Sequence, residues 1–151
     1  MRRADQLAGS LFAIGACFVV LGGLVAAITQ PMGLEHGSWL AAYLVLVCGV
    51  AQCAAGMVRH QLGGRPATPP HALALLLSWN LGNGAVVTGT LVGEPFVVDA
   101  GGALLLAALL VAGRDVRYSP RPVAVLAYRL LSAVLLISIP VGLALAHLRA
   151  P

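Results

Sequence analysis

Five long apolar stretches dominate this chain, and each is close to the length of a helix that crosses a membrane. A bilayer core about 30 Å thick needs about 20 mainly apolar residues of helix. Of the 151 residues, 60% are hydrophobic and only 9% are charged. The stretches cover residues 7–28, 38–58, 71–92, 95–113 and 123–147. We therefore predict an all-α bundle of transmembrane helices that forms a single domain over residues 1–151.

The fourth stretch, residues 95–113, has an alternative interpretation. It contains Asp99 and the pair Gly101 and Gly102, which could mark a short re-entrant segment, and the bundle would then have four spanning helices. The connections between stretches contain turn-forming Pro and Gly, as in Pro31-Met32-Gly33.

The basic residues predict the orientation of the helices. All nine are arginines, and cytoplasmic loops of membrane proteins carry the excess of positive charge. If every stretch spans, seven arginines fall on one side: Arg2, Arg3, Arg59, Arg65, Arg114, Arg117 and Arg121. The amino terminus is then cytoplasmic and the carboxyl terminus external. We therefore expect the arginines to interact with the bilayer, and we expect no nucleic-acid partner.

Composition and motifs bound the function further. Abundant Ala, Gly, Leu and Arg without Lys is typical of a high-GC bacterial gene, and predicts the inner (cytoplasmic) membrane. The three cysteines lie inside apolar stretches, where free buried thiols are expected. We find no P-loop, HExxH, GxSxG or EF-hand pattern. No catalytic residue can therefore be named.

Three residues at the outer end of the second stretch share one helix face. His36, Trp39 and Tyr43 are spaced i, i+3 and i+7. This face could hold a cofactor, or its aromatic rings could form an ordinary interfacial belt. His36 is a candidate axial ligand for haem b or for a metal ion, and His147, on the same predicted side, is the candidate second ligand.

Two amides lie near the middle of the third stretch. Asn80 and Asn83 stand beside Trp79, where unpaired polar atoms are expensive. They could hold helices together, with Gln52 as a partner, or form a small pocket for a quinone head group, a haem propionate or a transported solute. Asp99 would suit a proton-coupled transporter.

Segments 35–49 and 79–89 carry a family resemblance. The first begins with Glu35 and His36 and continues into a helix rich in Leu and Gly; the second contains Trp79-Asn80-Leu81-Gly82-Asn83. They resemble helix pairs of small membrane proteins related to haem-copper oxidase subunit I and to NnrS-type nitric-oxide-response proteins. The resemblance implies a haem or copper ligand at His36 on the outer side. The chain has no paired histidines for a copper centre, so the resemblance implies a haem-binding or accessory protein.

Two functional hypotheses follow from the sequence. The first is an accessory or structural membrane protein that binds haem or quinone and associates with a membrane redox complex. The second is a small transporter or channel component that works as a homo-oligomer.

Overall fold

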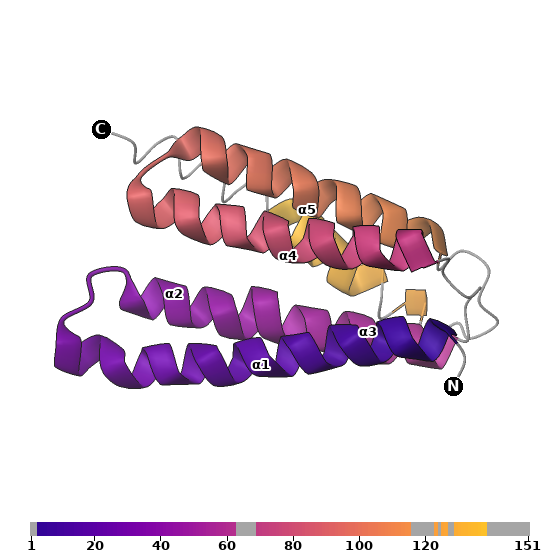
Figure 1. The fold of residues 1–151 in the computed structure, drawn as a ribbon, viewed down its shortest axis with the longest axis horizontal. Coiled ribbons are helices and arrows are strands. Elements are labelled where there is room, and N and C mark those ends of the chain that lie inside the picture. The colour runs from indigo at the N-terminus through magenta and orange to yellow at the C-terminus, as the bar shows by residue number, and fades with distance from the viewer. Residues whose placement is uncertain (1–2, 63–68, 116–122, 124, 127–128, 139–151) are drawn as a thin grey trace. The chain divides into compact units, whose positions relative to one another are not determined.

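The computed structural model describes residues 3–62, 69–115, 123, 125–126 and 129–138. Over these residues it contains helices and no strand, which confirms the all-α prediction. The chain divides into two compact units, Met1–Gln61 and Leu62–Pro151, and each is described by itself. Figure 1 shows the course of the helices within each unit.

The first unit is a hairpin of two long helical segments. Helix α1 runs over Arg3–Met32. The returning segment consists of α2 (Gly37–Tyr43), a π-helix η1 (Leu44–Val50) and α3 (Ala51–Leu62), without interruption. Gly33 ends α1 in the left-handed region, with φ of 60°, and the Leu34 N–H donates to the Thr29 carbonyl at 3.0 Å. This is the hydrogen bond of a Schellman turn, which Gly allows because it has no Cβ.

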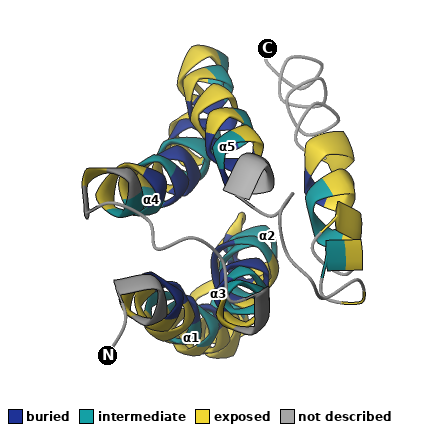
Figure 2. Cartoon of the chain, turned by 90° about the vertical axis from the view of Figure 1, so that its right-hand side faces the viewer, coloured by how far each residue is buried: buried dark blue, intermediate teal, exposed yellow. Residues whose placement is uncertain are grey.

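The second unit contains another helical hairpin. Helix α4 covers Pro69–Val92 and helix α5 covers Pro95–Asp115. Gly93, with φ of 73°, ends α4, and the Glu94 N–H donates to the Gly89 carbonyl at 2.8 Å. The buried residues of α4 and α5 lie on the sides where the two helices meet (Figure 2). A shorter apolar helix, Arg129–Ser138, belongs to this unit.

Four helical segments of the described chain are long and apolar enough to cross a membrane: Gln6–Met32, Gly37–His60, Ala72–Val92 and Pro95–Ala112. The first four predicted stretches are therefore confirmed as apolar helices. The fourth, for which a re-entrant segment was the alternative, is one uninterrupted helix. Of the fifth, the structure describes Arg129–Ser138 as helix, and the remainder lies largely outside the described residues.

Glycines at intervals of seven residues let the two segments of the first hairpin approach closely. A Cβ added at Gly56 would lie 2.7 Å from the Ala8 carbonyl oxygen. At Gly15 it would lie 2.8 Å from the backbone nitrogen of Cys53. Gly22 packs in the same way against Ala41 and Val45. Small residues at a helix interface bring backbones together, and this packing replaces the hydrophobic effect inside lipid.

The second hairpin is built on the same principle. Gly82 of α4 faces Gly101 of α5, and a Cβ on Gly101 would lie 2.6 Å from the Gly82 carbonyl oxygen. Seven residues after Gly82, Gly89 faces Val98. Close backbone contact therefore fixes the register of α4 against α5.

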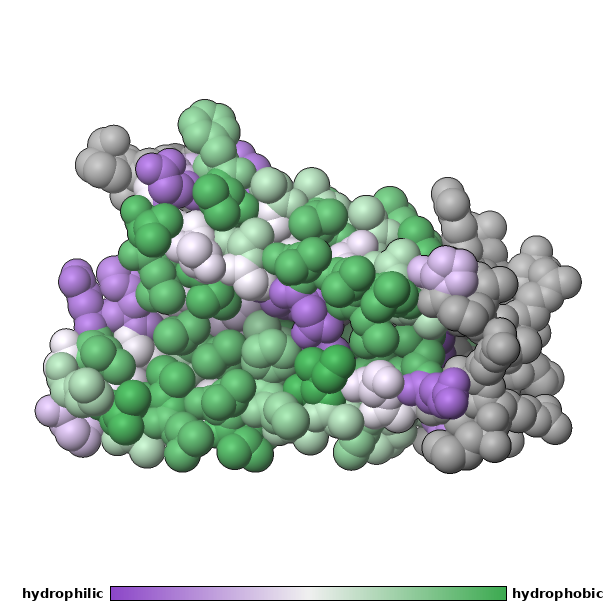
Figure 3. Space-filling model, viewed as in Figure 1, coloured by the Kyte–Doolittle hydropathy of each residue, from purple (hydrophilic) through white to green (hydrophobic). Residues whose placement is uncertain are grey.

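The outward-facing side chains are mostly apolar. Large exposed hydrophobic residues occur on every spanning segment, and include Val20, Leu24, Leu46, Leu81 and Leu110. Figure 3 shows this surface as largely hydrophobic along the helices. Such a surface suits hydrocarbon rather than water, and the described part of the chain is that of a multi-span membrane protein.

Candidate functional site

The amino-terminal end of the second span carries the predicted aromatic face. Trp39 and Tyr43 stack, with ring centroids 5.3 Å apart and an interplanar angle of 28°. Both are half-buried on the span that begins at Gly37. Trp39 and Tyr43 are therefore in contact on one face of the span, and both the cofactor and the interfacial interpretations stay predictions.

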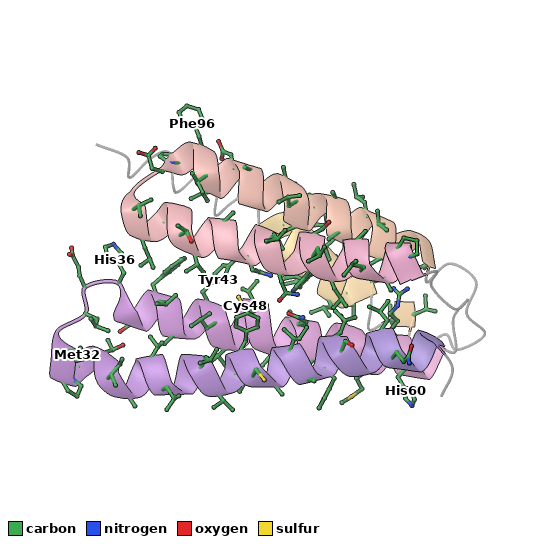
Figure 4. The ribbon with its side chains drawn as sticks, viewed as in Figure 1. Met32, His36, Tyr43, Cys48, His60 and Phe96 are labelled. Carbon is green, nitrogen blue, oxygen red and sulfur yellow. The ribbon has the colours of Figure 1, made fainter. Side chains whose placement is uncertain are left out.

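His36 lies in the turn that connects α1 with α2 (Figure 4). It is exposed, and its side chain makes no capping hydrogen bond to α2. Within the described residues, no three His, Cys, Asp or Glu side chains come together as a metal site. His147 lies outside the described residues. The haem and metal roles of His36 thus remain predictions.

A π-helix follows Tyr43 directly, and sequence reasoning missed it. The Ala51 N–H donates to the Leu46 carbonyl, five residues earlier, in place of the four-residue step of an α-helix. π-helices are rare and occur often at functional sites. A signal was present in the sequence: Gly37, Ala41, Val45 and Gly49 recur every four residues. In an α-helix, residues four positions apart differ by about 40° in direction around the helix. Three such intervals add up to about 120°, so Gly49 would no longer lie on the same face as Gly37. The π-helix takes more residues per turn and keeps these residues facing α1.

Cys48 and Gln52 are buried side chains at and just after the π-helix. Cys48 is 1% exposed, and Gln52 is completely buried. Neither the Nε2 nor the Oε1 atom of Gln52 has a hydrogen-bond partner among the described residues. The predicted pairing of Gln52 with Asn80 or Asn83 would join the two units, and it stays a prediction.

The cysteines differ in their surroundings. All three are free, but only Cys48 is buried, whereas Cys17 is exposed on α1. The Cys53 thiol donates to the Phe12 carbonyl oxygen at 3.4 Å. The prediction of free thiols is therefore confirmed. The prediction that the thiols are buried is confirmed for Cys48, but not for Cys17 or Cys53.

Helix α4 carries the second candidate site at the middle of its span. Trp79, Asn80 and Asn83 lie within about 100° of one another around the helix. The Asn80 amide donates to the Leu76 carbonyl at 2.9 Å, and the Asn83 amide donates to the Trp79 carbonyl at 2.9 Å. Each bond holds an NH2 group against the helix's own backbone, one turn back, as short polar side chains do in helices.

Two polar atoms of this α4 face are left without partners. The Trp79 indole N–H and the Asn80 Oδ1 atom are buried and have no hydrogen-bond partner within the described chain. An unsatisfied buried group costs about 1–3 kcal/mol, and there is no water in the bilayer core to compensate. Neighbouring residues thus offer one unused donor and one unused acceptor inside the membrane span.

Asp99 lies on α5, one turn after its start, and is half-buried. A role for this carboxyl group in transport stays a prediction.

Comparison with protein-family models, curated proteins and solved structures finds no match to this chain.

Proposed function

We propose that this chain is an accessory protein of a membrane redox complex, and that the polar face of α4 binds a quinone head group. The observation that carries the proposal is the pair of unpartnered buried atoms, Trp79 Nε1 and Asn80 Oδ1. They belong to adjacent residues in the span Ala72–Val92. A ligand that satisfies both atoms would remove the cost of leaving them unpaired.

Quinone chemistry matches these two atoms. A hydroxyl of the reduced form, the quinol, can accept a hydrogen bond from the Trp79 indole N–H and donate one to Asn80 Oδ1, whereas a carbonyl of the oxidised form can pair with Trp79 alone. The head group is neutral, so its transfer from lipid needs no charged partner, and its isoprenoid tail stays in the bilayer. Because both protein atoms are enclosed, neighbouring side chains must move to admit the ligand. We therefore expect binding to be slow compared with diffusion.

His36 supplies a second element of the proposal, directly before the span Gly37–His60. Its exposed imidazole could ligate haem b from a partner in the complex, as the family resemblance implies. We propose the bacterial inner membrane as the location, with the amino terminus in the cytoplasm. This orientation is supported by the arginines on one side.

The ligand can be identified by purification in a mild detergent, solvent extraction and mass spectrometry of the extracted quinones. We expect quinone in amounts comparable to the protein, and at least tenfold less in Trp79→Phe and Asn80→Leu. Trp79→Phe keeps the ring and removes the donor. Trp39→Phe, which alters the only other tryptophan, is the matched control and should retain the ligand. Equal quinone in all four proteins, or none in any, would refute the proposal.

The alternative is a small oligomeric transporter or channel component in which Asp99 lies on the path. It is favoured only by this half-buried carboxyl group in a spanning helix. Solute uptake by proteoliposomes that is lost in Asp99→Asn, together with normal quinone content, would favour it over the accessory protein.

A further inference from the structure

The returning segment of the first hairpin carries two parallel rows of residues, one position apart. One row contains Gly49, Cys53 and Gly56, and the other contains Cys48, Gln52 and Ala55. The members of each row are three or four residues apart, so each row can form one face of an α-helix. The sequence thus supplies two faces that could pack against α1.

The structure uses the first row. A Cβ on Gly49 would lie 3.0 Å from the Val19 backbone nitrogen, and one on Gly56 would lie 2.7 Å from the Ala8 carbonyl oxygen. Cys53 lies against Gly15 and donates its thiol proton to the Phe12 carbonyl. This register depends on the π-helix Leu44–Val50, which accommodates one residue more than an α-helix would place there.

A uniform α-helix would present the second row instead. Counted from Gly37 and Ala41 at about 100° per residue, the positions that return to the same face are those of Cys48, Gln52 and Ala55. Converting the π-helix to an α-helix would therefore rotate α3 (Ala51–Leu62) by about one residue, or roughly 100°. Helix register shifts of this kind occur in microseconds to milliseconds.

Each of the two registers carries a cost that the other avoids. In the observed register, both atoms of the Gln52 carboxamide are buried without partners in the described chain. In the rotated register, Gln52 takes the place of Cys53 opposite Gly15, which has no side chain to obstruct it. Its Nε2 group can then donate to the Phe12 carbonyl, the acceptor that Cys53 uses now. The rotated register thus exchanges the thiol hydrogen bond of Cys53 for an amide hydrogen bond of Gln52, and the observed register has the tighter glycine packing.

We propose that the second span is a two-state element that switches between these registers by interconversion of the π-helix with an α-helix. The switch concerns the first hairpin alone and does not depend on quinone binding. It turns the Gln52 amide and the Cys48 thiol toward α1 in one state and away from it in the other.

Disulfide cross-linking in membranes distinguishes the two registers. In the background Cys17→Ala, Cys53→Ala, the only remaining native thiol is that of Cys48. Adding Val19→Cys places a second thiol where α1 now faces Gly49, which is where Cys48 arrives in the rotated register. Oxidation with copper phenanthroline and intact-mass analysis then measure the intramolecular disulfide. We expect a disulfide to form at a rate that reports the rotated fraction.

Two further changes should move this rate in opposite directions. Gly56→Ala forces a Cβ against the α1 backbone only in the observed register, so the rate of cross-linking should rise at least threefold. Deletion of Leu46, which is 61% exposed, removes the extra residue of the π-helix. The first row then faces α1 from a uniform α-helix, and cross-linking should fall at least tenfold. Gly23→Ala, where an added Cβ meets nothing within 4 Å, is the control and should leave the rate unchanged.

The proposal is overturned if no disulfide forms in the starting variant, or if Gly56→Ala and Gly23→Ala cross-link at equal rates. Circular dichroism and gel filtration show whether the Leu46 deletion folds. If it does not, the comparison of Gly56→Ala with Gly23→Ala decides the question alone.

Discussion

The contact between α4 and α5 predicts opposite effects for alanine at two glycines of the same helix. At Gly82, an added Cβ would lie 2.9 Å from the Gly101 carbonyl oxygen and 2.9 Å from the Cγ atom of Leu105. At Gly84, two residues further along, it would meet nothing within 4 Å. Gly82→Ala must therefore push the helices apart, whereas Gly84→Ala adds a methyl group on an open surface.

Two contributions determine how far the two variants differ in free energy of unfolding. Replacing Gly by Ala inside a helix favours folding by up to about 1 kcal/mol, and this term is common to both variants. Overpacking a tight contact costs about 1–3 kcal/mol, and it applies to Gly82→Ala alone. We expect the free energy of unfolding of Gly82→Ala to lie about 1–3 kcal/mol below that of Gly84→Ala, because the helix-propensity term cancels in the comparison.

Reversible unfolding in mixed micelles, with increasing mole fraction of sodium dodecyl sulfate and helicity as the signal, measures this difference. Before unfolding, both variants should have the same oligomeric state and the same helix content. If their unfolding free energies agree within about 0.5 kcal/mol, the close contact at Gly82 does not exist, and the packing described for the second hairpin is wrong.

Two other predictions concern the turns. Gly93→Ala should lower the free energy of unfolding by about 1–2 kcal/mol in the same titration, because its φ of 73° is unfavourable for a residue with a Cβ; no loss would contradict the left-handed turn. The haem prediction for His36 requires a Soret band from protein made with haem supplied, and requires its loss in His36→Ala. A colourless protein under these conditions would refute the haem prediction.

The helices could be predicted because a single physical requirement governs them. A segment that crosses hydrocarbon must be long, apolar and helical to satisfy its backbone, so hydropathy located the four described spans. Boundaries were close as well, since Gly33 and Gly93 mark helix ends. The extra residues of the first helix, which continues to Met32 through Pro31, were not expected, because Pro usually ends a helix.

The π-helix could not be predicted from hydropathy, because inserting one residue into an apolar stretch leaves its mean hydropathy nearly unchanged. The information lies in the four-residue spacing from Gly37 to Gly49, and it becomes visible only once α1 is known to be the neighbour. Because the π-helix was not predicted, the sequence analysis did not connect Cys48 with Gln52.

The polar groups of α4 were found from the sequence, but their bonding was not. Asn80 and Asn83 were expected to seek partners on other helices, and their NH2 groups bond instead to carbonyls of α4 itself. Trp79 was noted only as a neighbour. The unpaired state of its indole N–H depends on burial, which a hydropathy pattern does not report.

The proposed quinone site can be tested most directly through the two tryptophans. Trp39→Phe leaves Trp79 as the only tryptophan, and Trp79→Phe leaves Trp39. Both proteins, in lipid nanodiscs, are titrated with a short-chain quinone that quenches indole fluorescence. We expect saturable quenching of Trp79 and only weak, linear quenching of Trp39. Linear quenching of both tryptophans with the same slope would contradict a binding site on α4.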